Sequence, residues 1–479
     1  MKKHLTQKLT AITLAILLLC TLASCSQTSK LMRLPEDERA VAVWELINEN
    51  ADAADSFSAT NKTTISGTMY GVEGMEATSD VRMTVHGYTG KNMIYRIEST
   101  TVVETGNSKT TVQFKEGYES GKMYTEYSDD LSTQQLFSAI SQADFLAHVE
   151  ERSNDNMPDI TADSCTVKTC VKEEDGTFTL TFSGFTEDSL DQFEDMLGTM
   201  RNALLGDHKI TDVHLTVKVS ADFYPKTLDI EYVMEARSES APEAPVITME
   251  MAYDGFNTTE APAAIDFLGY TEVDDLRVLT LVSDLLSERQ TAESGAFQTT
   301  LSQEYKISGQ TQTFEETDEV TFTNRDGAYT YQINADDGNY DYDISYANGK
   351  QRVIVKLGNS TLADETTTSD DNTAMLFING LMDPGSFTTT NIADIEVKDA
   401  EAGIYVLTVK EPDLTAFASV IQSVRGTSAH GDATVTVTIQ NGRLTEYVYE
   451  LKATSSTASY GTLAIQYTAS CVYIDEATS

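Results

Sequence analysis

The chain has few basic residues: its 479 residues include 33 lysines and arginines against 75 aspartates and glutamates. A protein that binds nucleic acid needs clustered Lys and Arg side chains that displace the counterions of the phosphates. Anionic lipid headgroups attract folded proteins through the same kind of basic cluster. We therefore expect no nucleic-acid partner, and no charge-mediated attraction between the folded body and a membrane.

Cysteine and histidine are scarce as well. Of the 5 cysteines, Cys20 and Cys25 lie near the N-terminus, which leaves Cys165, Cys170 and Cys471 for the rest of the chain. An odd number argues against a disulfide framework, and Cys165 and Cys170 lie on one predicted strand about 17 Å apart, beyond the reach of a disulfide. The 6 histidines show no metal-ligand spacing. We expect buried free thiols, no metal site and no cofactor.

Motifs that carry catalysis are missing. The sequence contains no nucleophile elbow, no zincin helix and no glycine-rich phosphate loop. Acidic residues are so numerous that no pair of them stands out as catalytic. The acidic residues 334–343 would place Ile333 and Ile344 at the first and last ligand positions of a calcium loop, so an exposed hairpin is the better interpretation. The sequence therefore predicts a protein that is not an enzyme.

The most informative segment is the N-terminal leader. Three lysines precede residues 9–24, which are uncharged and mostly apolar, and the segment ends in Leu22-Ala23-Ser24-Cys25. This layout is typical of a secretory signal. The apolar run is shorter than the about 20 residues that span a bilayer. The alternatives are an uncleaved anchor, or an ordinary export signal with an accidental cysteine.

The leader resembles the bacterial lipoprotein signal, in which the last cysteine is diacylated and becomes the mature N-terminus. The resemblance implies that residues 1–24 are a signal peptide, that Cys25 is the lipidation site and that residues 25–38 form a tether. Two acyl chains, for example palmitate, are enough for stable attachment. We therefore expect a lipid-anchored protein on the extracytoplasmic face of the cell membrane.

The rest of the chain contains one pattern twice. Leu190, Phe193 and Leu197 form a helical stripe that recurs 224 residues later as Leu414, Phe417 and Ile421. Further matches join Tyr118–Lys122 to Tyr346–Lys350, Leu136-Phe137 to Leu376-Phe377, and the segment from Phe57 to Gly67 to that from Phe297 to Gly309. A repeat of this length is a duplicated domain and not a solenoid unit. We place the copies at residues 39–270 and 271–479.

Each copy predicts the same order of elements: a helix, a meander of strands, a helix, two strands, a third helix and closing strands. Such a meander can bury its helices only against one concave sheet face. We therefore expect an α+β fold of two tandem similar domains, each a curved antiparallel sheet wrapped on helices.

This element order and the leader are similar to those of the LolA/LppX/LprG-like half-barrel family, whose curved sheet encloses an apolar cavity that receives acyl chains. The resemblance implies a lipid or other apolar ligand. The third helix of each copy would then border the ligand site through Leu190, Phe193, Leu197, Leu414, Phe417 and Ile421. The alternative for these residues is a purely core role. The alternative function is that of a non-enzymatic structural or protein-interaction lipoprotein of the cell envelope, with an unknown protein partner.

Overall fold

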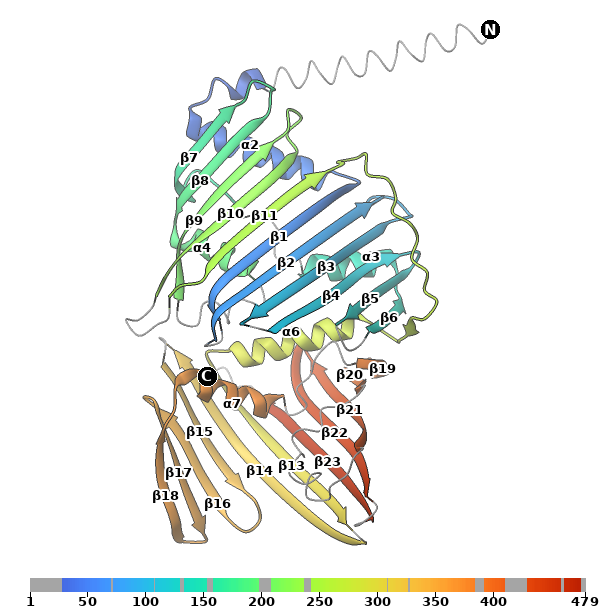
Figure 1. The fold of residues 1–479 in the computed structure, drawn as a ribbon, viewed down its shortest axis with the longest axis vertical. Helices are drawn as coiled ribbons and strands as arrows, with labels where there is room; N and C mark the ends of the chain where they lie inside the picture. Colours follow the sequence, from blue (N-terminus) through green and yellow to red (C-terminus); the bar gives the residue numbers. More distant parts are fainter. Residues whose placement is uncertain are drawn as a thin grey trace. The chain divides into compact units, whose positions relative to one another are not determined.

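The computed structural model describes residues 28–474, apart from residues 70–71, 107, 130–132, 153–157, 198–207, 237–242, 308, 326–327, 384–391, 410–428 and 458–460. The chain forms two compact units. Unit 1 contains the described residues up to Thr133 together with Ile140–Leu268, and unit 2 contains Gln134–Ala139 together with the described residues from Gly269 onward. Both are mostly β and are built on large, curved sheets that do not close (Figure 1).

In its described residues, unit 1 has ten antiparallel strands together with helices. Its strands follow the order β5-β4-β3-β2-β1-β11-β10-β9-β8-β7. The elements are α2 (Glu36–Asp52), β1 (Phe57–Met69), β2 (Val72–His86), β3 (Ile94–Thr105), β4 (Ser108–Glu119), β5 (Lys122–Ser128), α3 (Gln142–Arg152), β7 (Cys165–Lys172), β8 (Phe178–Phe185), α4 (Glu187–Met196), β9 (His208–Val219), β10 (Pro225–Ala236) and β11 (Val246–Asp254).

Unit 2 repeats this topology. Its sheet has the order β18-β17-β16-β15-β14-β13-β23-β22-β21-β20-β19, in which β13 and β23 take the central places that β1 and β11 hold in unit 1. The elements are α6 (Arg277–Thr291), β13 (Ser294–Ile307), β14 (Gln310–Arg325), β15 (Ala328–Asp336), β16 (Asp341–Ala347), β17 (Lys350–Leu357), β18 (Ser360–Thr368), α7 (Asp371–Met382), β19 (Ile392–Asp399), β20 (Ile404–Val409), β21 (Ala429–Gln440), β22 (Arg443–Thr457) and β23 (Gly461–Ile474).

A short strand from early in the chain belongs to unit 2. Strand β6 (Thr133–Ala139) pairs in parallel with β12 (Thr271–Glu272) through Leu136 and Phe137. The Val273 N–H donates to the Phe137 carbonyl at 2.9 Å, and the Leu276 N–H donates to the Ser138 hydroxyl at 3.1 Å. Unit 2 therefore uses residues that the sequence analysis placed in the first copy.

The core of unit 1 lies where α2 meets the sheet. Its buried face includes Val43, Trp44 and Ile47, and the Trp44 ring packs edge-on against Phe182 at 5.8 Å. The indole N–H of Trp44 donates to the Pro158 carbonyl at 3.2 Å, which satisfies its polar atom in the core. Leu31 also belongs to this core, and α2 begins at Glu36, so part of the segment assigned to the tether is packed into unit 1.

The matched segments Tyr118–Lys122 and Tyr346–Lys350 each form a tight turn, at Gly121 and at Gly349. Each joins two antiparallel strands, β4 to β5 and β16 to β17. Ser120 and Gly121 have φ of 54° and 79°, and Asn348 and Gly349 have 52° and 72°. Two successive positive φ values are characteristic of the type I′ hairpin turn, which Gly adopts without steric cost.

One of the sequence matches is wrong. Leu136 and Phe137 are buried residues of strand β6, whereas Leu376 and Phe377 lie on helix α7 and are 60% and 43% exposed. A dipeptide carries no periodicity, so it cannot distinguish a strand from a helix. By its place in the topology, α7 is the counterpart of α3, and β18 is the counterpart of β6.

The three described cysteines are free and buried, as predicted: Cys165, Cys170 and Cys471. Burial raises the pKa of all three thiols, to about 11 for Cys170. Within the described part of the chain, no helix has the length and apolar character needed to cross a membrane.

Candidate functional site

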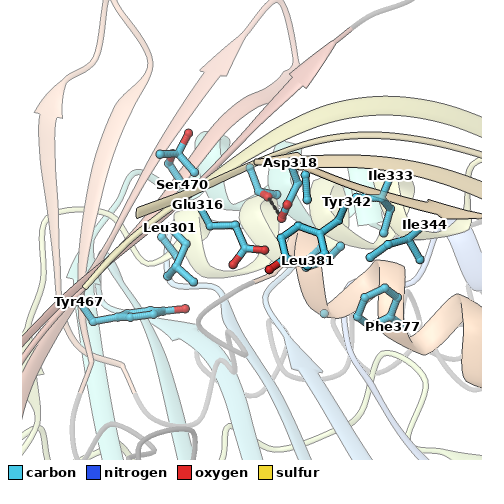
Figure 2. A pocket seen from close by; sticks show the side chains of 15 residues that line it. Leu301, Glu316, Asp318, Ile333, Tyr342, Ile344, Phe377, Leu381, Tyr467 and Ser470 are labelled. Carbon is cyan, nitrogen blue, oxygen red and sulfur yellow. Dashed lines mark hydrogen bonds between the residues drawn. The ribbon is translucent and has the colours of Figure 1, made fainter. Parts of the chain in front are cut away.

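Unit 2 contains a cavity of about 460 Å³ between helix α7 and the sheet face beneath it (Figure 2). Small-molecule sites usually measure about 300–1,000 Å³. Strands β13 to β16, strand β23 and helix α7 supply its walls. The lining residues are Thr299, Thr300, Leu301, Glu316, Asp318, Ile333, Ala335, Tyr342, Ile344, Phe377, Gly380, Leu381, Tyr467, Ala469 and Ser470.

The N-terminus of α7 is fixed over the sheet by two aspartates. The Asp370 carboxylate accepts a hydrogen bond from the Thr373 N–H at 2.8 Å, which is a standard helix cap. The Asp371 carboxylate accepts from the Tyr329 N–H at 3.2 Å and from the Tyr346 hydroxyl. These bonds attach the first turn of the helix to β15 and β16, so the upper wall of the cavity has a defined position.

The C-terminus of α7 is held by the last strand. The buried Tyr473 hydroxyl donates to the Met382 carbonyl at 2.9 Å. The Arg289 guanidinium of α6 lies 5.1 Å from the Tyr473 ring and donates to the Leu444 carbonyl at 2.8 and 3.2 Å. The two described helices of unit 2 are thus attached to the closing strands, and α7 is anchored at both ends.

The cavity walls are largely apolar. Ile333 and Ile344 come from neighbouring strands, and Phe377 and Leu381 face them from α7 (Figure 2). Phe377 is 43% exposed although its ring lies only 6.0 Å from the ring of Tyr331. An aromatic side chain on an open cavity wall provides apolar surface that a ligand can cover.

Two carboxylates enter this apolar space from β14. Glu316 and Asp318 are two residues apart on a strand, so their side chains lie on the same face of the sheet. Asp318 accepts a hydrogen bond from the Thr299 hydroxyl at 2.8 Å. Within the described residues, Glu316 makes neither a hydrogen bond nor an ion pair.

The pKa values of both carboxylates are raised. Burial raises the pKa of Glu316, and the negative charges of Asp318 and Asp337 raise it further. Burial also raises the pKa of Asp318, which the Thr299 hydrogen bond partly counteracts. None of the described lining residues is Lys, Arg or His, so this described part of the cavity wall contributes no counter-charge.

Two tyrosines complete the polar edge of the cavity. The Tyr342 hydroxyl donates to the Asp337 carboxylate at 2.9 Å. Figure 2 shows the Tyr467 ring at the opposite end of the cavity, with the Glu316 carboxylate between Leu301 and Tyr342. Burial raises the pKa of Tyr467, so its phenol stays neutral. The site therefore combines apolar walls, neutral hydroxyls and an acidic pair.

The sequence-predicted residues of unit 1 lie in the core. Leu190, Phe193 and Leu197 are buried, and Phe193 has an exposed fraction of 0%. Its ring packs against Phe185 at 4.8 Å, and the Tyr232 hydroxyl donates to the Phe193 carbonyl at 3.3 Å. These three residues do not line the cavity of unit 2. Their packing matches the alternative to a ligand site, in which these residues serve only as core.

The other predicted site residues cannot be placed: Cys25, Leu414, Phe417 and Ile421 lie outside the described residues. The cavity of unit 2 is lined instead by residues that were not predicted from the sequence, above all Glu316, Asp318 and Phe377. A signal for the acids is present in β14. Val320 and Phe322 on this strand are buried, and side chains two residues apart on a strand lie on the same face of the sheet. Asp318 and Glu316, two and four residues before Val320, are therefore expected on the same inward face.

No known protein family and no curated protein matches the sequence. Solved structures similar to this chain include a protein of unknown function from the DUF3598 family of Nostoc punctiforme, 9% identical, with a TM-score of 0.11, covering 90% of this chain and 98% of that one. Transferrin-binding protein B from Haemophilus parasuis is 6% identical, with a TM-score of 0.15, covering 88% and 76%. The translocator domain of the autotransporter NalP from Neisseria meningitidis is 8% identical, with a TM-score of 0.10, covering 92% and 98%. Similarities at this level establish neither a fold relationship nor a function.

Proposed function

We propose that the chain is an acyl-anchored lipoprotein of the cell envelope that binds or carries an apolar ligand. The leader ending at Cys25 supports the anchor and the extracytoplasmic location. The half-barrel resemblance supports a ligand-carrying role. The observation that carries the proposal is the cavity of about 460 Å³ in unit 2, whose apolar walls lie beneath a helix fixed at both ends.

The energetic reason is the apolar surface left open on α7. Covering apolar surface stabilises a complex by about 25 cal/mol per Å². Phe377, on the cavity wall, can contribute to this because 43% of it is accessible before any ligand binds. In this proposal the ligand is held and released unchanged, so the protein is not an enzyme and needs no cofactor.

One observation also favours the alternative function. Leu376 and Phe377 are adjacent on α7 and are 60% and 43% exposed. Neighbouring exposed apolar residues suit a protein contact as well as a ligand. A structural or protein-interaction lipoprotein would use this helix surface and leave the cavity empty.

Gly380 allows the two functions to be separated. It lies on α7 in the cavity wall, and a Cβ atom at this position would meet nothing within 4 Å. Replacing glycine inside a helix by Ala stabilises the helix by about 0.5–1 kcal/mol, and Leu is nearly as good a helix former. Gly380→Leu therefore adds bulk at the cavity wall without disturbing the fold, and Gly380→Ala is its matched control.

The test measures binding of the neutral fluorescent probe N-phenylnaphthylamine to the mature chain. We expect the wild type and Gly380→Ala to bind the probe, and Gly380→Leu to bind it at least several-fold more weakly with an unchanged melting temperature or a higher one. Absence of probe binding in the wild type, or equal binding in Gly380→Leu, would contradict ligand binding in this cavity. The interaction function would then be the better account.

A further inference from the structure

We infer that the cavity of unit 2 selects amphiphiles with a cationic head group, whose apolar chain packs against α7 while an ammonium group binds between Glu316 and Asp318. This inference rests on the proposed function and names the class of ligand. Cationic amphiphiles include alkylamines and lipids or peptides with one exposed amine next to an apolar chain.

The geometry of the acidic pair provides the head-group site. Glu316 and Asp318 lie on one face of β14, and the Thr299 hydroxyl occupies one oxygen of Asp318 at 2.8 Å. The other carboxylate oxygens of the pair have no hydrogen-bond donor among the described residues. An ammonium group has three N–H donors in a compact arrangement, which suits two carboxylates on neighbouring inward positions.

The apolar part of the site begins directly beside these acids. Leu301 lies on the adjacent strand β13, and Figure 2 shows the Glu316 carboxylate between Leu301 and the ring of Tyr342. Phe377 and Leu381 follow on α7. A ligand that satisfies both regions must therefore carry its charge at one end of an apolar body.

The charges around the site favour a cation and oppose an anion. Apart from Glu316 and Asp318, the ionisable groups near the site among the described residues include the Tyr342 phenol on β16, the Asp337 carboxylate in the turn before it and the phenols of Tyr467 on β23 and Tyr305 on β13. Helix α7 carries no basic residue, and the described lining residues of β13 carry no charge. Burying carboxylates without a counter-charge is unfavourable, and a bound cation supplies that counter-charge.

A fatty acid anion would do the opposite, because its carboxylate would add another negative charge to this group. Compared with the acyl-chain ligands implied by the half-barrel resemblance, the preferred ligand keeps the apolar chain and does not carry an anionic head group. This distinction can be measured directly, since amphiphiles with the same chain and different head groups are readily compared.

The experiment uses the mature chain and three probes with the same alkyl chain, each below its critical micelle concentration: dodecylammonium, dodecanol and dodecanoate. Binding is followed by calorimetry near neutral pH. We expect dodecylammonium to bind about tenfold or more tightly than dodecanol, since a hydrogen bond to a charged group contributes about 1.5–3 kcal/mol. Dodecanoate should bind most weakly.

Two variants assign the preference to the acidic pair. Glu316→Gln and Asp318→Asn should each weaken dodecylammonium binding about tenfold while leaving dodecanol binding within about twofold. The control is Glu319→Gln, a change of the same kind on the same strand, at an exposed position on the opposite face. It should leave all three affinities unchanged.

The outcomes separate the inference from the proposed function. Equal binding of all three probes, or dodecylammonium binding that is unchanged in both Glu316→Gln and Asp318→Asn, would overturn the cation preference while the cavity remains a ligand site. Binding of none of the probes would overturn both.

Discussion

Thr299 and Asp318 are directly paired across strands β13 and β14, and the Thr299 hydroxyl donates a 2.8 Å hydrogen bond to the Asp318 carboxylate. This bond favours the ionised form of Asp318 and so counteracts the effect of burial on its pKa. Glu316, on the same face two residues earlier, has no comparable donor among the described residues. The two carboxylates therefore differ in how well the protein supports their charge.

Glu316→Gln should stabilise the ligand-free protein at neutral pH. The pKa of Glu316 is raised in the folded state by burial and by the charges of Asp318 and Asp337. When the pKa of an acid is higher in the folded than in the unfolded protein, its protonated form favours folding. This contribution to the free energy of unfolding is lost as the pH rises through the folded-state pKa and the group ionises. Because Gln is always neutral, the variant should melt higher than the wild type at pH 7.

The difference should disappear in acid, below the ordinary pKa range of a glutamate, where the wild-type side chain is also neutral. Thermal unfolding followed by circular dichroism between about pH 3 and pH 8, in steps of about one unit, measures it. Glu319→Gln, the same change at an exposed position of the same strand, is the control. A Glu316→Gln protein that melts lower than the wild type at pH 7 would show that the ionised side chain has a stabilising partner.

Phe193→Ala should destabilise unit 1 by about 3–5 kcal/mol, because it opens a cavity in a packed core. Phe193 is fully buried, whereas Phe377 is 43% exposed. Truncation of Phe377 to Ala should cost less than about 1.5 kcal/mol of stability and should weaken probe binding instead.

The stability of the Phe193→Ala variant can be measured by fluorescence. Trp44 is the only tryptophan of the chain and lies in the core of unit 1, so its fluorescence follows the unfolding of that unit.

A loss of less than about 1 kcal/mol in Phe193→Ala would mean that Phe193 borders an existing cavity, as the sequence analysis proposed. The counterpart Phe417 lies outside the described residues, so its place beside a ligand stays a sequence-based prediction. Phe417→Ala should then reduce binding of N-phenylnaphthylamine. Unchanged binding would argue against that role.

Expression of residues 269–479 alone tests the predicted independence of the second copy. We expect a cooperative melt, but at a lower temperature than unit 2 shows in the full chain. The fragment lacks the Phe137 carbonyl and the Ser138 hydroxyl, which accept hydrogen bonds from the N–H groups of Val273 and Leu276. Each intramolecular hydrogen bond lost in this way costs about 0.5–1.5 kcal/mol.

A synthetic peptide of residues 133–139 should raise the melting temperature of this fragment, and a scrambled peptide of the same composition should not. A gradual, non-cooperative melt that the peptide does not correct would contradict independent folding. In that case the two copies do not each contain a complete core.

Cys25→Ala should abolish lipid attachment. We expect the wild type to fractionate with membranes and the variant to appear in soluble fractions or as an unprocessed precursor, because the leader ends at this cysteine. Mass spectrometry of the N-terminal peptide measures the acyl chains directly. A processed Cys25→Ala protein that still sediments with membranes would contradict the lipid anchor.

The order of the elements was predictable because the local periodicity of apolar residues determines it. Apolar residues at every second position around Leu180 predict a strand, and β8 lies there. Apolar residues at helical spacing, including Val43 and Ile47, predict a helix, and α2 lies there. The assignment of β6 to unit 2 was not predictable, because it depends on hydrogen bonds between residues far apart in the chain. The candidate site was only partly predictable. Alternation places Glu316 on the inward face, but a cavity depends on how completely neighbouring side chains fill the space.

The pairing of β13 with β23 at the centre of the second sheet has a consequence for biosynthesis. Ala296 pairs with Ile474, so two strands from opposite ends of the unit are hydrogen-bonded neighbours. One half of the sheet can form as soon as its meander is made, but the two halves are joined only by the last strand. Contacts between residues so distant in the chain form slowly. A chain that is truncated before β23 therefore has two additional unpaired sheet edges, on β13 and on β22, and unpaired edges are prone to aggregation.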